Sequence, residues 1–167
     1  MAAPRYVNRV SGKDKQIAAA TTAAADSIVA TDSTGKLDIS LMPVGVGAEV
    51  FIGPTSENIA AGALVNIYSN AGVTTVRNAD ATTNGKPADG FVLASTTSPA
   101  NATVYFESNT NTQVTGLTPG VDYWLATTPG AITTTPPSAA GNNNQYVGKA
   151  LSATALAFSK GEPVEMA

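Results

Sequence analysis

The feature that most constrains the fold is a succession of short apolar segments in residues 48–167, separated by turn residues about every 8–12 positions. The segments are rich in Val, Thr and Tyr, which suit a pleated sheet. Pro119-Gly120 and Asn70-Ala-Gly72 are typical of turns, and the latter lies between two such segments and predicts a hairpin. The pattern predicts an all-β fold, namely a small barrel or sandwich of about ten short strands.

The large apolar side chains of these segments are expected to form the core. Aromatic residues are few, at 6% of the chain. A small β domain with few large side chains gains little from its own core, so we expect a homo-oligomer. The predicted core comprises Val50, Ile52, Leu64, Ile67, Val76, Phe91, Leu93, Val104, Phe106, Val114, Leu117, Tyr123, Leu125, Ile132, Tyr146, Leu151, Leu156 and Phe158.

The first 47 residues differ from the rest in charge and composition. Arg5, Arg9, Lys13 and Lys15 against the single acid Asp14 give the first 16 residues a charge of +3, whereas the remaining 151 carry 5 basic and 11 acidic groups. An Ala/Thr run and a Gly- and Pro-containing stretch follow. We therefore expect an extended basic N-terminal arm and linker over residues 1–47, ahead of a body over residues 48–167.

A basic arm on an acidic body is expected to dock on a negative partner. An acidic protein surface and nucleic acid both qualify, and a solvated terminus is the other interpretation. Four charges with one aromatic residue, Tyr6, make a weak nucleic-acid pattern. No apolar run is long enough to span a bilayer or to form the core of a signal peptide. We therefore expect that the protein binds neither nucleic acid nor a membrane. We also expect that the chain is made in a cytoplasm.

The composition removes several classes of chemistry, because the chain has no Cys and no His. Disulfides, thiolate nucleophiles, zinc ribbons and Ser-His-Asp triads cannot be built. Asp89 and Glu107, on neighbouring predicted strands, could form a glycosidase pair, but ordinary surface acids are the favoured interpretation. The spacing of Asp32 and Asp38 around a Gly does not match an EF-hand loop. We expect no enzyme, no cofactor and no metal site.

Exposed aromatic residues offer a further possibility. Tyr123 and Trp124 are adjacent on a predicted strand, so one should face the core and the other the surface or an interface. Together with the polar loop Asn142–Asn144, they could contact a cell-surface glycan.

Several motifs together resemble virion structural proteins of tailed bacteriophages. Ahead of a Thr/Asn/Gly-rich β domain stands the sequence Gly-Lys-Leu-Asp-Ile-Ser-Leu-Met-Pro, at residues 35–43. Further segments are similar to these phage virion proteins, namely residues 79–92, 102–106, 116–120 with 123–125, and 147–152. The capsid decoration proteins, also called head cement or head fibre proteins, fit best, over nearly the whole chain from about residue 31 onward. The motif at residues 35–43 also occurs in tail-fibre and tail-spike proteins.

The resemblance implies a β-rich knob, commonly trimeric, that binds the major capsid protein on the outer surface of the virion after assembly in the host cytoplasm. No catalytic residues accompany it. A tail-fibre or receptor- and glycan-binding module of a phage tail is the alternative. The capsid-binding arm is then expected to use Arg5, Tyr6, Arg9, Lys13 and Lys15, with Leu37, Ile39, Leu41 and Met42 as arm anchors or as a subunit interface.

Overall fold

The computed structural model describes residues 5–10, 13–21, 28–31, 33, 35–38, 41, 47–82 and 85–167; for residues 5–20 and 28 it describes the backbone only. The chain divides into two compact units, Met1–Gly47 and Ala48–Ala167, which we call the N-terminal unit and the body. The described residues form strands and turns without an α-helix, which confirms the all-β prediction. No helix among them is long and apolar enough to cross a membrane.

The N-terminal unit contains a small sheet. Strands β1 (Arg5–Val10) and β2 (Lys13–Ala20) form an antiparallel hairpin, in which Arg9 stands opposite Asp14. Strand β3 (Ile28–Val29) pairs with the end of β2 in parallel, which gives the order β1-β2-β3. The sequence predicted extended chain in this part; the hairpin adds a defined register to it.

The first sheet of the body is antiparallel, with the order β4-β8-β7-β5-β6. The predicted hairpin is confirmed as β5–β6, and Ala71 and Gly72 at its tip have φ angles of 50° and 85°. Two positive φ angles in a two-residue loop match the twist of the flanking strands. The strands are β4 (Val50–Pro54), β5 (Leu64–Asn70), β6 (Val73–Asn78), β7 (Gly90–Val92) and β8 (Asn101–Tyr105).

This sheet bends until its two edges meet. An isolated bridge joins Thr55, just after β4, to Val76 in β6, and the amide of Ser56 donates to the Val76 carbonyl at 3.0 Å. The sheet is thus a small barrel, and one face of its strands points into the barrel interior. The interior is filled by Ile59, Ala63, Val65, Val76, Val92, Ala102 and Val104, with Phe51, Ile67 and Phe106 packed against them.

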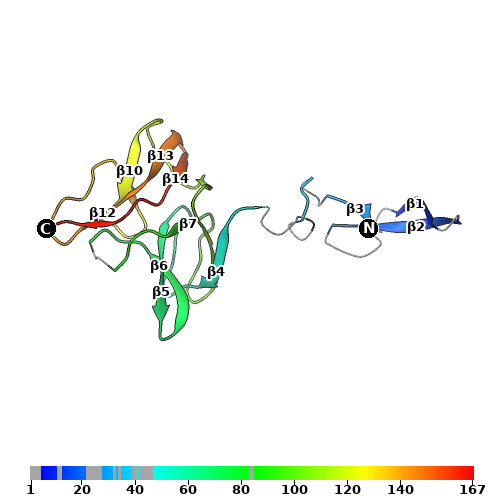
Figure 1. Ribbon diagram of the computed structural model, residues 1–167, viewed down its shortest axis with the longest axis horizontal. Coiled ribbons are helices and arrows are strands. Elements are labelled where there is room, and N and C mark those ends of the chain that lie inside the picture. Colours follow the sequence, from blue (N-terminus) through cyan, green and yellow to red (C-terminus); the bar gives the residue numbers. More distant parts are fainter. Residues whose placement is uncertain are drawn as a thin grey trace. The chain divides into compact units, whose positions relative to one another are not determined.

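A second sheet, with the order β11-β10-β13-β14-β9, packs on the outside of the barrel. Figure 1 shows β10, β13 and β14 side by side at the top of the body and the β5–β6 hairpin at the bottom. A short ribbon of β12 (Asn143–Asn144) and β15 (Val164–Glu165) accompanies the sheet. The strands of the second sheet are β9 (Thr110–Asn111), β10 (Asp122–Leu125), β11 (Ile132–Thr133), β13 (Tyr146–Ser152) and β14 (Ala155–Phe158).

Phe91 lies at the centre of the layer between barrel and sheet. Its ring centroid is 5.7 Å from that of Tyr105 in the barrel and 5.5 Å from that of Phe158 in the second sheet. Buried Gln145 adds a polar connection: its side-chain amide bonds to both the N–H and the C=O of Ala88 and donates to the Gly161 carbonyl at 3.0 Å. These contacts fix which face of the second sheet is buried.

Most of the predicted core residues lie in one of these two layers. Leu64, Val76, Phe91, Val104, Leu117, Tyr123, Leu125, Leu156 and Phe158 are buried, and Ile67, Leu93, Phe106, Val114 and Ile132 are partly buried against them.

The prediction of burial was wrong for three residues of this set: Val50, Ile52 and Leu151 are 40%, 60% and 60% exposed. In β4 the inward side chain is Phe51, which packs on the barrel interior. Because side chains alternate along a strand, burying Phe51 turns its two neighbours outward. Tyr146 is only half-buried, for a reason that the next subsection gives.

Candidate functional site

The two sheets of the body differ in how much of their surface is covered. One face of the barrel strands lines the barrel interior, and the other packs in part on the second sheet, with Val50 and Ile52 of β4 left exposed. The second sheet buries one face, through Tyr123 and Leu125 in β10, and turns Asp122 and Trp124 outward, where they are half-buried. The outer face of β10 and β13 is therefore the candidate site.

Trp124 and Tyr146 form an aromatic pair on this outer face. They are opposite each other in the β10–β13 register, with ring centroids 6.1 Å apart and ring planes at 76°. Such an edge-to-face geometry is favourable because the positive edge of one ring meets the negative face of the other. The pair gives the sheet a rigid apolar patch whose phenol and indole N–H can still form hydrogen bonds.

An ion pair continues the same face. Lys149 Nζ lies 2.9 Å from Asp122 Oδ1, and the two side chains are 52% and 43% exposed. The Tyr146 hydroxyl donates to the same carboxylate oxygen at 3.4 Å. An exposed pair of this kind adds little to stability. Its consequence is to hold a carboxylate and an ammonium group beside the aromatic pair.

The electrostatics follow from these contacts. Burial, and then the charge of Asp122, raise the pKa of Tyr146 above its ordinary value. The hydrogen bond to Asp122 and the charge of that carboxylate raise the pKa of Lys149. The phenol therefore stays neutral and the ammonium stays charged at neutral pH.

A β-bulge brings Tyr146 and Lys149 to the same face. Residues an odd number of positions apart point to opposite faces of a regular strand. The β10–β13 register shifts between Tyr123 and Trp124, so that Asp122 pairs with Lys149 and Trp124 with Tyr146. Such a shift explains why sequence alternation placed Tyr146 in the core.

Gly148 makes the bulge possible. Its φ is 142°, and a Cβ built there would lie 2.2 Å from the Ala157 carbonyl oxygen on β14. A larger residue at this position would have to displace the neighbouring strand.

A pocket lined by both hydroxyl and apolar side chains adjoins the aromatic pair. Thr133 of β11 is the register partner of Trp124, and so their side chains share a face. Thr133 also lines a pocket of about 590 Å³ together with Thr127, Thr135, Ser138 and Asn142. The lining contains no charged residue.

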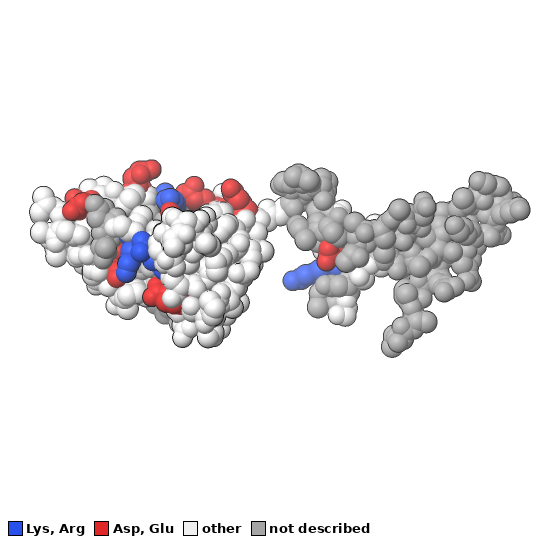
Figure 2. Space-filling model, turned by 90° about the horizontal axis from the view of Figure 1, so that it is seen from below, with Lys and Arg blue, Asp and Glu red and all other residues white. Residues whose placement is uncertain are grey.

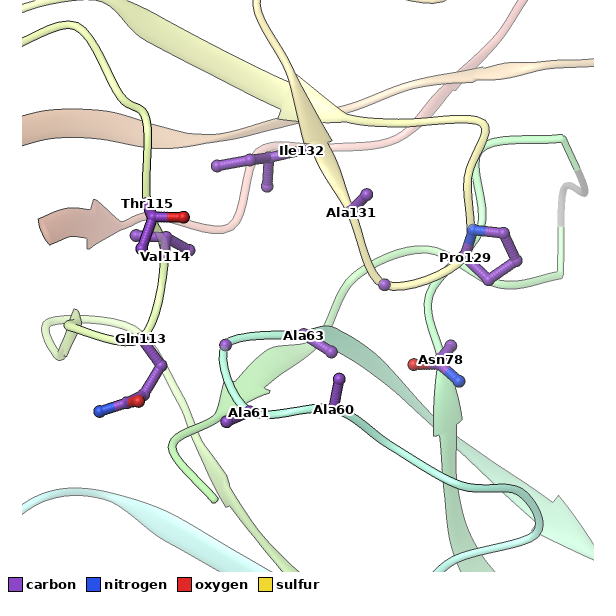
Figure 3. Close-up of a pocket in the computed structure, with 12 residues that line it drawn as sticks. Ala60, Ala61, Ala63, Asn78, Gln113, Val114, Thr115, Pro129, Ala131 and Ile132 are labelled. Atoms are coloured by element: carbon purple, nitrogen blue, oxygen red, sulfur yellow. The ribbon is translucent and has the colours of Figure 1, made fainter. Parts of the chain in front are cut away.

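A different pocket lies where the barrel loops meet the second sheet (Figure 3). It measures about 370 Å³ and is lined largely by small residues such as Ala61 and Ala63, with Asn78 and Gln113 at its sides. Asn78 Nδ2 donates to the Asn58 carbonyl at 3.2 Å. The lining of this pocket therefore offers few polar groups to a ligand.

The structure brings the two candidate glycosidase acids to one pocket, of about 400 Å³, beside Lys160. Both are engaged in structural contacts. Asp89 pairs with the Lys160 ammonium at 2.8 Å and accepts from the amide of Ile67, while Glu107 accepts from the Lys160 amide at 2.7 Å. These bonds tie the C-terminal segment to the barrel. In the part of the chain that the structure describes, no group of three or more acidic residues is placed to hold a metal ion.

The predicted glycan contacts are corrected in part. Tyr123 is 6% exposed and its hydroxyl accepts from the Thr118 amide at 3.0 Å, so it belongs to the core. Asn143 and Asn144 pair with β15 through their main chain, and Asn143 is buried. Trp124 remains on the surface, and sequence reasoning missed its partners Tyr146, Asp122 and Lys149. Opposite charges with an aromatic residue on neighbouring strands were the available signal, but the bulge concealed their alignment.

The predicted arm residues lie in the N-terminal unit. The backbone of Arg5, Tyr6 and Arg9 belongs to β1 and that of Lys13 and Lys15 to β2; their side chains lie outside the described part of the structure.

The predicted arm anchors lie in the same unit. Leu37 is 44% exposed and Leu41 is half-buried, while Ile39 and Met42 lie outside the described residues. Nothing in the structure tests the roles of the arm residues or of the anchors.

Charge on the body is sparse. Figure 2 shows one face of it, on which charged side chains form small separate groups within a largely uncharged surface.

Comparison with solved structures finds a structural similarity. The chain is similar to a phage head fiber base. That solved structure, head fiber gp8.5 N base in bacteriophage phi29, has a TM-score of 0.46 and 12% sequence identity, and the match covers 70% of this chain and 98% of that chain. No residue role of that protein is carried over. No family model matches the chain, and no curated protein matches it in sequence.

Proposed function

We propose that this protein is a virion structural protein that decorates and stabilises the outer surface of a tailed-phage capsid by binding the major capsid protein. The observation that carries the proposal is the division into two compact units, Met1–Gly47 and Ala48–Ala167. Four basic residues precede residue 16, and the remainder is acidic overall. The phage-like motifs at residues 35–43 and through the body support the same assignment. The protein would act by contact, without catalysis.

The N-terminal unit has two features that suit attachment to a shell. Strands β1 and β3 are the edges of its sheet, and an edge strand can pair with a strand of a partner through main-chain hydrogen bonds. Arg5 and Arg9 lie on β1 itself, where they can meet acidic groups of the major capsid protein. Leu37 is 44% exposed, and we propose that it anchors the arm together with Ile39, Leu41 and Met42.

Deletion of residues 2–16 tests the attachment. We expect the truncated protein to lose binding to shells assembled from the major capsid protein, while its far-UV circular dichroism still reports a folded body. The double variant Arg5→Glu/Arg9→Glu should weaken binding, and Lys149→Glu on the body is the matched control that should not. Saturation of the shells by the truncated protein at the wild-type concentration would refute the role of the arm.

A homotrimer forms part of the proposal. Val50 and Ile52 project from β4, an edge strand of the barrel sheet, and are 40% and 60% exposed. Burying such side chains between subunits would add to the small core of each body. Light scattering should give three times the monomer mass for the wild type and a lower mass for Ile52→Asp, with the equally exposed Leu151→Asp unchanged. A monomeric wild type would refute this part.

The alternative is a location on the phage tail, where the chain would serve in receptor recognition. Imaging of virions with and without the protein separates the two locations. We expect the difference density on the shell; density confined to the tail would overturn the capsid assignment.

A further inference from the structure

We propose that the outer face of β10 and β13 is a saccharide-binding site, formed by Trp124 and Tyr146 with Asp122 and Lys149 beside them. The proposal is independent of capsid attachment, which is assigned to the N-terminal unit. It gives the body a second function, in which a shell-bound protein presents a sugar-binding surface to its surroundings.

The aromatic pair is the first feature that supports a sugar site. A pyranose ring has an apolar face of C–H groups, and it binds against indole and phenol rings, which combine an apolar body with a polar tip. The rings of Trp124 and Tyr146 stand 6.1 Å apart at 76°, and both side chains are half-buried on the outer face. Contact of the two rings with each other, and the bond from the Tyr146 hydroxyl to Asp122, restrain the rings, so less conformational entropy is lost when a ligand binds.

The charged groups beside the rings are the second feature that supports a sugar site. Sugar hydroxyls need both acceptors and donors, and the Asp122 carboxylate and the Lys149 ammonium provide one of each within 2.9 Å of each other. Both groups are about half exposed, so a ligand can reach them. Their mutual contact and the bond from the Tyr146 hydroxyl to Asp122 hold them beside the aromatic pair.

The pocket next to the aromatic pair is the third feature that supports a sugar site. From Trp124 the face continues through Thr133 to a pocket of about 590 Å³, whose lining combines hydroxyl and amide side chains with apolar ones such as Ile132 and Pro136. Uncharged hydroxyls and an amide are suited to hydrogen bonding with a second sugar unit. A linear oligosaccharide could therefore lie on the aromatic pair and extend into the pocket.

The test uses the full-length protein and a printed array of defined oligosaccharides that includes neutral hexose, N-acetylhexosamine and uronic-acid chains. Trp124 is the one tryptophan of the chain, so its fluorescence reports directly on this face. We expect at least one oligosaccharide to be retained on the array and to shift or quench that fluorescence in a saturable titration.

Variants separate a sugar site from a structural role. Trp124→Ala should lose array binding, and Tyr146→Ala should weaken it about tenfold, whereas Tyr146→Phe keeps the ring and should retain most of it. Val73→Ser, at a side chain 55% exposed on the barrel hairpin, is the matched control. Thermal unfolding checks that each variant is folded.

Three results would overturn the proposal. The first is an array on which no oligosaccharide binds, and the second is unchanged binding in both alanine variants. The third is a folded Trp124→Ala protein that no longer attaches to capsid shells, because the face would then be a protein interface. Failure of the arm deletion to abolish shell binding would refute the capsid-binding arm and leave the saccharide site standing.

Discussion

The two sheets of the body are built from similar residues but differ in how much of their surface is covered. The barrel sheet has one face covered by its own interior and part of the other covered by the second sheet, with Val50 and Ile52 of β4 left exposed. The second sheet has one covered face and one free face, which carries the Trp124–Tyr146 pair and the Asp122–Lys149 ion pair. A sheet that closes on itself adds stability to the body, and the sheet left open supplies a surface that can bind. We therefore place the binding function of the body on the open sheet.

The largest effect is expected from Phe91, which joins the two sheets. Phe91→Ala should destabilise the body by about 3–5 kcal/mol, because it removes a buried ring and leaves a cavity between Tyr105 and Phe158. Denaturant unfolding followed by circular dichroism measures the change. A loss below about 1 kcal/mol, typical of a surface position, would show that the two sheets do not share one core.

Gly148 tests the bulge on which the free face depends. Gly148→Ala should cost about 2–4 kcal/mol, because its Cβ meets the Ala157 carbonyl and its φ of 142° disfavours a side chain. Gly72→Ala, at a turn with φ 85° and open space around it, is the comparison variant to which no close contact contributes. Equal losses in the two variants would show that Gly148 is not in close contact with β14.

Adjacent residues of β10 compare the two faces directly. Tyr123→Phe should cost about 1 kcal/mol, because it removes the hydroxyl that accepts from the Thr118 amide. Trp124→Phe on the outer face should change stability by no more than about 0.5 kcal/mol. Both are measured by denaturant unfolding with circular dichroism. If Trp124→Phe proves the more destabilising, the assignment of inner and outer faces is wrong.

The smallest effect is expected from pH. The pKa values of Tyr146 and Lys149 are raised above 10.0 and 10.5, so the folded state holds these protons more tightly than the unfolded state. Stability from both groups is present at lower pH and is lost as pH rises from about 10 through the folded pKa values. Melting temperatures should fall in this window, and less so in Asp122→Asn. An identical fall in the variant would show that Asp122 does not cause the shifts.

The predictable part of the fold is local. The β5–β6 hairpin followed from Asn70-Ala-Gly72 between two apolar segments, and the structure confirms it with positive φ at Ala71 and Gly72. Most of the predicted core is buried as well, because apolar side chains in strands must be covered somewhere. The error in β4, where Phe51 rather than Val50 and Ile52 packs inward, arose because all three residues are apolar and alternation alone does not choose between the two faces.

The candidate site was harder to predict, because its members come from two strands and depend on a bulge. Strand alternation predicts that one of Tyr123 and Trp124 faces outward. The apolar pattern places Tyr146 in the core and indicates no role for Lys149. Their alignment with Trp124 and Asp122 depends on a register shift, which no local pattern of apolar residues marks.

The sequence by itself determined that this chain forms short strands joined by turns, because strand propensity and turn chemistry act over a few residues. Tertiary structure alone decided that one sheet closes into a barrel and that the other keeps a free face. Strand closure, the covering of a face and the bulge at Gly148 all depend on contacts between segments far apart in the chain. The energy of those contacts is set by which surfaces meet, and a local sequence pattern does not specify that.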